Sequence, residues 1–138
     1  MTIEEHIRLV LDRASIGTLY TVHEGNPYGR YMTFRSDGAT LYTVTDKHSA
    51  KLMDIEKNPH VHVLLGYQPG TENNYLEFEG QVTDVIDDNL RMKMRNFFRL
   101  VFQKDATEVT LLKIEPSVIY LHTQDGSPAQ KLVLPADL

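Results

Sequence analysis

The sequence has no cysteine and no tryptophan among its 138 residues. Without cysteine the chain cannot form disulfides, thiolate nucleophiles or zinc ribbons, so histidine and carboxylate side chains are the remaining metal ligands. Long hydrophobic runs are absent as well, and none approaches the ~20 residues that cross a bilayer. The chain opens with acidic side chains where a secretory signal would carry basic ones. We therefore expect a cytoplasmic protein with no membrane partner.

An excess of positive charge is also missing. The formal net charge is −5, which disfavours binding to nucleic acid, and we expect no such partner. Hydrophobic residues make up 41% and charged residues 24% of the chain, as in ordinary globular proteins. The length fits one compact domain, and no repeat or low-complexity segment divides it. We predict a single domain over residues 1–138.

Three segments carry helical patterns. Thr2 and Glu5 form a capping box in front of apolar residues at helical spacing, which predicts an N-terminal helix. A short one-sided helix begins in "TDKHSAKL" and ends before "KNP", because proline disfavours helix in the residue before it. A third helix carries the apolar stripe Leu90, Met94, Phe97, Phe98 and Val101.

Most of the remaining chain alternates between strand-like and turn-like stretches. The turns are predicted at "GNPYG", "RSDGA" and "QPGTENN", and no strand is predicted in the tail after residue 123. Many short strands with tight connections favour an antiparallel barrel of the α+β class, mainly β, with six or seven strands and peripheral helices. The predicted strands span residues 15–22, 30–34, 40–44, 60–67, 74–85, 109–116 and 117–123.

The stretch "TDKHSAKL" is a candidate anion site. A helix N-terminus presents unpaired amides and the positive end of the helix dipole. Thr45 stands at the expected N-cap position, Ser49 falls in the first turn, and Lys51 adds a positive charge. The alternative is an ordinary hydroxyl cap followed by a solvated lysine, and such caps are common.

Arg30 is the second candidate for anion binding. Strand alternation places Arg30, Met32 and Phe34 on one face, with Tyr31 and Thr33 on the other. An arginine that shares a face with methionine and phenylalanine suggests a nearby anion. The alternative is an arginine that lies over apolar surface with its head group in water.

In order and spacing, these motifs resemble the flavin-binding split-barrel family that includes the pyridoxamine phosphate oxidases, and more closely its short general stress protein branch. That branch has an Arg-x-Met strand, a Thr-x-x-x-Ser-x-Lys turn into a helix, a following Asn-Pro and a strand that ends in Gly. The matching residues are Arg30 and Met32, Thr45, Ser49 and Lys51, Asn58 and Pro59, and Gly80. The resemblance implies a split β-barrel.

The resemblance also implies a cofactor, FMN or alternatively FAD. In such proteins the arginine, the lysine and the hydroxyls hold the flavin phosphate, and the ring lies along the barrel strands. Carried over residue by residue, the phosphate ligands are Arg30, Thr45, Ser49 and Lys51, and the residues that border the isoalloxazine are Tyr31, Met32, Thr33 and Val44.

The family places its cofactor at the interface of a homodimer, so we expect a second copy as partner. Tyr75 and the helix over residues 89–102 are candidates to line the site from the second chain, and one of the cations on this helix is a candidate for the second phosphate of FAD. Two departures argue against oxidation of vitamin B6. Ala50 replaces an arginine of the true oxidases, and their C-terminal tryptophan and Arg-x-His segment are missing.

The resemblance favours a flavin-dependent oxidoreductase of unknown substrate. A protein that only binds or stores flavin is the alternative, as is a barrel that has changed its ligand to deazaflavin or haem. We propose no acid or base residue, because the flavin supplies the redox chemistry. His60 and His62 lie on the same side of one strand, but no third ligand is evident nearby, so we predict no metal site.

Overall fold

A computed structural model of the chain describes residues 1–102 and 109–138. The three helices of this part are α1 (Ile3–Arg13), α2 (Ala50–Lys57) and α3 (Asp88–Phe102). The strands are β1 (Ile16–His23), β2 (Asn26–Thr33), β3 (Arg35–Asp37), β4 (Thr40–Asp46), β5 (His60–Leu65), β6 (Tyr75–Thr83), β7 (Val109–His122) and β8 (Gln130–Val133). All three predicted helices are present, and Thr2 caps α1 by accepting a hydrogen bond from the Glu5 amide.

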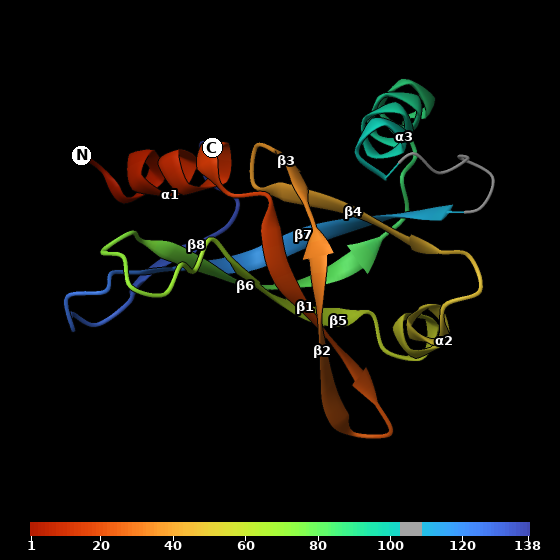
Figure 1. The fold of residues 1–138 in the computed structure, drawn as a ribbon, viewed down its shortest axis with the longest axis horizontal. Helices are drawn as coiled ribbons and strands as arrows, with labels where there is room; N and C mark the ends of the chain where they lie inside the picture. Colours follow the sequence, from red (N-terminus) through yellow and green to blue (C-terminus); the bar gives the residue numbers. More distant parts are fainter. Residues whose placement is uncertain (103–108) are drawn as a thin grey trace.

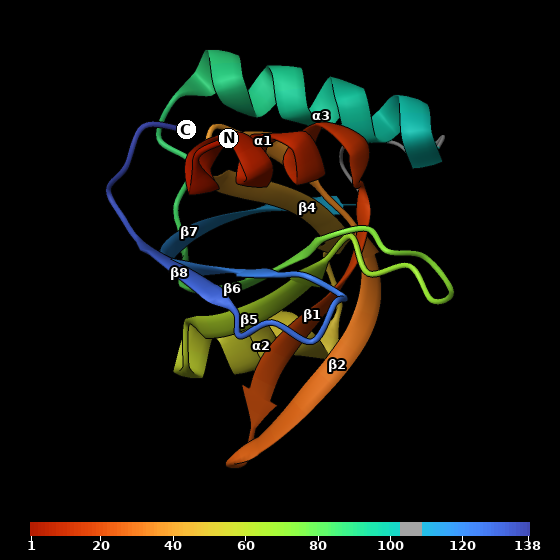
Figure 2. The ribbon, with the colours of Figure 1, turned by 90° about the vertical axis from the view of Figure 1, so that its left-hand side faces the viewer.

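All strands join one antiparallel sheet with the order β2-β1-β5-β6-β7-β4-β3, and β8 pairs with β7 outside this path. The sheet is strongly curved, with α1 and α3 on one side and α2 on the opposite side (Figures 1 and 2). This arrangement confirms the predicted mainly β split barrel with peripheral helices. No helix in the described part of the chain is long and apolar enough to cross a membrane.

The core fills the inside of the curved sheet. Along β1, β5 and the first half of β6, buried side chains that point inward alternate with more exposed ones on the outer face. The helix α1 closes one end with Ile7, Val10 and Leu11, whose spacing gives it one apolar stripe. A second cluster around Tyr42 and Phe98 packs α3 against β4.

The first hairpin differs from the prediction. Most of the predicted turn "GNPYG" belongs to β2. The chain reverses at Glu24 and Gly25, so the turn begins one residue before the predicted segment. Both residues have positive φ, 51° and 82°, as in the two-residue turns that suit the twist of antiparallel strands. Pro27 is tolerated in β2 because this strand lies at the sheet edge, where no further strand needs its missing N–H.

The end of the chain also differs. Residues 109–116 and 117–123 were predicted as two strands, but they form the single strand β7. Pro116 fits within it because the pairing of β6 with β7 shifts register between Glu79 and Gly80, and bulges accommodate proline. The predicted "RSDGA" turn contains β3, and the tail adds β8, so the described sheet has eight strands.

Candidate functional site

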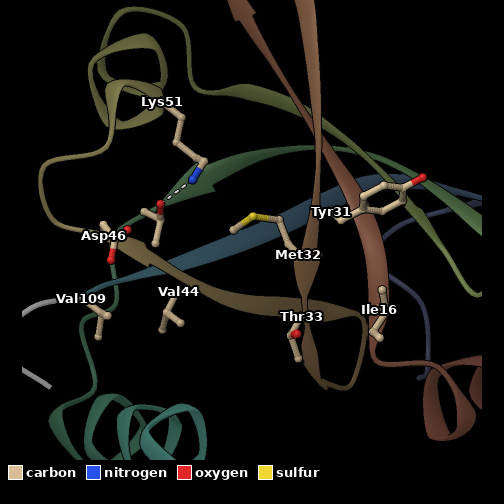
Figure 3. Close-up of a pocket in the computed structure, with 9 residues that line it drawn as sticks. Ile16, Tyr31, Met32, Thr33, Val44, Asp46, Lys51 and Val109 are labelled. Atoms are coloured by element: carbon tan, nitrogen blue, oxygen red, sulfur yellow. Dashed lines mark hydrogen bonds between the residues drawn. The ribbon is translucent and has the colours of Figure 1, made fainter. Parts of the chain in front are cut away.

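A pocket of about 430 Å³ opens where β2 passes β4 and the start of α2 (Figure 3). Its volume lies in the range typical of small-molecule sites. Lys51 lies at one end, and Tyr31 and Ile16 lie at the other. The lining residues are Ile16, Tyr31, Met32, Thr33, Val44, Thr45, Asp46, Lys51 and Val109.

The two main walls are β2 and β4, which are not neighbours in the sheet and are joined by a side-chain hydrogen bond. The buried Thr43 hydroxyl of β4 donates to the Thr33 carbonyl at the end of β2, at 2.8 Å. The next amide, that of Phe34, donates to the Ser15 carbonyl at 2.6 Å. The first bond holds the end of β2 over β4, where Met32 and Val44 line the same pocket, and the second extends the pairing of β2 with β1.

The start of α2 corrects the predicted roles of two hydroxyl residues. Ser49 is the N-cap, and its side chain accepts a hydrogen bond from the Lys51 amide at 3.3 Å. Thr45 is not a cap, because its backbone belongs to β4, where it pairs with Thr110 of β7. Its hydroxyl instead accepts a hydrogen bond from the Lys51 ammonium group. Thr45 and Lys51 therefore meet inside the pocket from different elements.

Lys51 is a buried cation, with only 8% of the residue exposed. Its pKa is lowered, first because burial disfavours the charged form and second because Arg30 lies close by, and Asp46 only partly opposes this. Neither Lys51 nor Arg30 forms a salt bridge within the described ranges 1–102 and 109–138. Among the described residues, the two cations therefore stand close together with no carboxylate in salt-bridge contact with either of them, and Asp46 acts on Lys51 only through its charge.

Arg30 approaches this point from β2. The residue is half-buried, and its guanidinium donates to the hydroxyl of the fully buried Thr21 at 3.4 Å. Because Arg30 bonds to a hydroxyl and acts electrostatically on Lys51, its charge is directed toward the lysine end of the pocket. One nitrogen of the head group thus contacts the protein, and the role of Arg30 toward an anion stays a prediction.

The structure brings most of the predicted site residues together. Arg30 lies next to this pocket, Ser49 supports it through the cap of α2, and Tyr75 lines a second, adjoining groove. Ile16, Asp46 and Val109 line the pocket without having been predicted. Strand pairing places Ile16 opposite Thr33 and Val109 opposite Asp46, which directly follows Thr45. The predicted residues that line the pocket itself are Tyr31, Met32, Thr33, Val44, Thr45 and Lys51.

Comparison with known proteins gives this pocket a family context. Residues 3–123 match the family model described as pyridoxamine 5′-phosphate oxidase. The chain belongs to the pyridoxamine 5′-phosphate oxidase family. Within this family it is similar to general stress protein 26 of Bacillus subtilis (strain 168), with 38% identity over 125 residues that cover 86% of this chain and 87% of that protein.

Solved structures agree with this membership. General stress protein 26 from Bacillus anthracis str. Sterne is 32% identical, with a TM-score of 0.80 over 97% of this chain and 100% of that chain. A putative pyridoxamine 5′-phosphate oxidase from Listeria innocua is 29% identical, with a TM-score of 0.78 over 91% of this chain and 100% of that one. The predicted resemblance to the general stress protein branch is confirmed.

More distant structures share the fold alone. One is an FAD-binding protein from Mesorhizobium loti, 16% identical with a TM-score of 0.66 over 86% of this chain and 92% of that chain. Another is a heme-binding protein from Mycobacterium smegmatis, 11% identical with a TM-score of 0.79 over 96% of this chain and 58% of that chain. Family membership therefore establishes the barrel, while the identity of the ligand has to be argued from the pocket.

Other candidate residues of this family member lie outside the pocket. His62 contacts the Glu77 carboxylate on the outer face of the sheet, and no cluster suited to a metal ion occurs among the residues that the structure describes. The described part of α3 does not line the pocket within one chain. Its Arg91 contacts Asp88 and the Val85 carbonyl, so a role of α3 in a dimer or toward FAD stays a prediction.

Proposed function

We propose that this protein binds a flavin, with FMN as the first choice and FAD as the alternative, and acts as a flavin-dependent oxidoreductase. The observation that carries the proposal is the pair of cations Lys51 and Arg30, neither with a salt-bridge partner among the described residues, at one end of a pocket with largely apolar walls. Burying a cation without a partner is unfavourable, so such a pair fits a site that takes an anionic group.

The donors at this end match a phosphate. A phosphate dianion would neutralise both cations and accept charged hydrogen bonds from them, and the hydroxyls of Thr45 and Ser49 would donate further bonds. The positive end of the α2 dipole, at the Ser49 N-cap, would favour negative charge at the same place. We assign the phosphate of the flavin to this end of the pocket.

The walls suit a flat ring. Met32 and Val44 supply apolar surface in the middle of the pocket, and Tyr31 and Thr33 lie toward the end away from Lys51 (Figure 3). A bound flavin would supply the electron-transfer chemistry, while these residues orient the ring and exclude water from its faces. No side chain of the pocket needs to act as an acid or base.

We also propose that the active form is a homodimer with the site at its interface. Ile16 and Tyr31 at the open end of the pocket are 65% and 86% exposed, and a second copy would cover this apolar rim. Sedimentation velocity at micromolar protein concentration tests this proposal. A clean dimer is expected, and a monomer over the whole concentration range would contradict it.

The absorption spectrum of the purified protein, followed by titration with FMN, tests the cofactor. We expect saturable binding of one flavin per chain, seen as quenching or enhancement of flavin fluorescence. Anaerobic addition of NADH or NADPH then separates the oxidoreductase from a flavin-storage protein. Bleaching of the bound flavin supports an enzyme, whereas a bound flavin that neither nicotinamide reduces supports storage. A haem or deazaflavin spectrum, or no binding of FMN and FAD, would contradict the proposed cofactor.

A further inference from the structure

A second groove adjoins the candidate flavin pocket on the outer face of the sheet. Its volume is about 560 Å³, which is also in the range of small-molecule sites. It shares two lining residues, Ile16 and Tyr31, with the flavin pocket, so the two spaces have a common border. The further side chains that matter here are Thr18, Leu64, Tyr67 and Tyr75.

The lining of this groove is aromatic and uncharged. Three tyrosines contribute to it, and no charged side chain lines it in the part of the chain that the structure describes. The Tyr67 and Tyr75 rings meet edge to face, with centroids 5.3 Å apart and planes at 87°. Tyr67 lines the groove and is 58% exposed, so part of its aromatic surface is accessible there, and aromatic surface favours contact with another flat ring.

A polar cluster behind Tyr75 holds its ring in place. The Tyr75 ring is stacked on His122, with centroids 4.7 Å apart and planes within 5° of parallel. The Glu77 carboxylate accepts a hydrogen bond from His122 Nε2 at 2.9 Å, and its other oxygen accepts one from His62. This cluster spans three neighbouring strands, with His62 on β5, Glu77 on β6 and His122 on β7. The pairing of these strands therefore holds the stacked rings in position.

We propose that this groove binds a neutral, planar aromatic compound such as a quinone, beside the ring of the bound flavin. The compound is neutral because a charge in the groove would lose water without gaining a partner of opposite sign. It is planar and aromatic because the three tyrosine rings and the apolar side chains that line the groove favour contact with a flat ring. The role of the site beside the cofactor rests on the proposed function, whereas binding in the groove can be measured without flavin.

Isothermal titration calorimetry with menadione, a neutral two-ring quinone, tests the proposal on FMN-saturated protein and on flavin-free protein. The test variant is Tyr67→Ala, since Tyr67 is 58% exposed and its loss should not disturb folding. Tyr28→Ala is the matched control, because Tyr28 is 47% exposed, makes one edge-to-face ring contact with His23 and lies outside the groove. We expect saturable binding that Tyr67→Ala weakens roughly tenfold and Tyr28→Ala leaves unchanged.

Several results would overturn the proposal. One is the absence of saturable menadione binding to either form of the wild-type protein. Another is binding that Lys51→Met abolishes and Tyr67→Ala leaves intact, because the probe would then occupy the flavin pocket. A third is a loss of binding in Tyr67→Ala that accompanies dissociation of a dimer in sedimentation, which would identify a second copy as the occupant. Failure of FMN to bind would contradict the proposed function. Menadione binding to the flavin-free protein would still show whether the groove binds an aromatic compound.

Discussion

Replacement of Lys51 by methionine gives the sharpest test of the phosphate site. Methionine keeps an unbranched side chain of similar length in a residue that is 8% exposed, and it removes the ammonium group that contacts Thr45. If this ammonium group binds the flavin phosphate, its loss removes a charged hydrogen bond worth about 1.5–3 kcal/mol. That energy corresponds to a flavin dissociation constant raised by about 10- to 150-fold.

The stability of the flavin-free protein should move in the other direction, or hardly at all. Lys51 is desolvated and faces Arg30, and both effects disfavour its charge in the folded state. Replacing a buried charge by an apolar side chain of similar shape is often neutral or stabilising. We therefore expect Lys51→Met to bind FMN more weakly while its urea unfolding midpoint stays the same or rises.

The assay is a fluorescence titration of FMN and of FAD with the wild-type protein and three variants. Arg30→Met should lose affinity like Lys51→Met, and Lys57→Met is the control, since Lys57 lies in the last turn of the same helix. A loss for both flavins would place the contact at the phosphate they share. Equal affinities for all four proteins would refute the phosphate site and the reasoning from this pair of cations.

The pH dependence of FMN binding supplies a second test of the same residue. Because burial and Arg30 lower the pKa of Lys51, the free protein loses this charge at a lower pH than an ordinary lysine would. FMN affinity should therefore fall as pH rises above that lowered pKa. Lys51→Arg, which stays protonated, should flatten this fall. An identical alkaline profile for wild type and Lys51→Arg would assign the titration to another group.

Two further predictions concern the scaffold that positions the site. His23 Nδ1 lies 2.6 Å from Asp54 of α2, and the hydrogen bond and charge of Asp54 raise the pKa of His23 above 6.5. Because the folded state holds the His23 proton more tightly, the contact with Asp54 stabilises the protein below pH 6.5, and this stabilisation disappears as pH rises through the raised pKa. His23→Gln should therefore destabilise the protein most at acidic pH, as measured by urea unfolding. Gly80→Ala should lower the free energy of unfolding by about 1–3 kcal/mol in the same measurement, because the added Cβ would lie 2.4 Å from the Glu115 carbonyl oxygen. Gln81→Ala is the control, since Gln81 is an exposed neighbour, and it should be nearly neutral.

Local patterns in the sequence were sufficient for the elements whose cause is local. The capping box of Thr2 and Glu5 and the apolar stripe behind it identified α1, since both act within one or two helical turns. Strand alternation also singled out Arg30 and the side chains next to it as candidates. It could not place the first turn, because "GNPYG" contains more turn-forming residues than the Glu24–Gly25 pair that the strand register selects.

Long-range pairing decided what local patterns left open. Thr45 has the properties of an N-cap, but β4 continues through it because β7, far along the chain, supplies its partner Thr110. The same pairing brings Val109 to the pocket, and β7 and β8 join the sheet only through contacts between distant segments. Propensity within a short window contains no information about such partners.

The sequence by itself determined which residues have the chemistry for an anion site: two cations, several hydroxyls and a helix start in the order typical of one family. Whether those cations are solvated or buried was decided by the tertiary structure alone. Lys51 on an isolated α2 would extend into water. It becomes a buried charge only because α2 packs against β1, Thr45 of β4 contacts its ammonium group, and Arg30 approaches from β2. Desolvation depends on everything that surrounds a side chain, and those surroundings come from parts of the chain far from it in sequence.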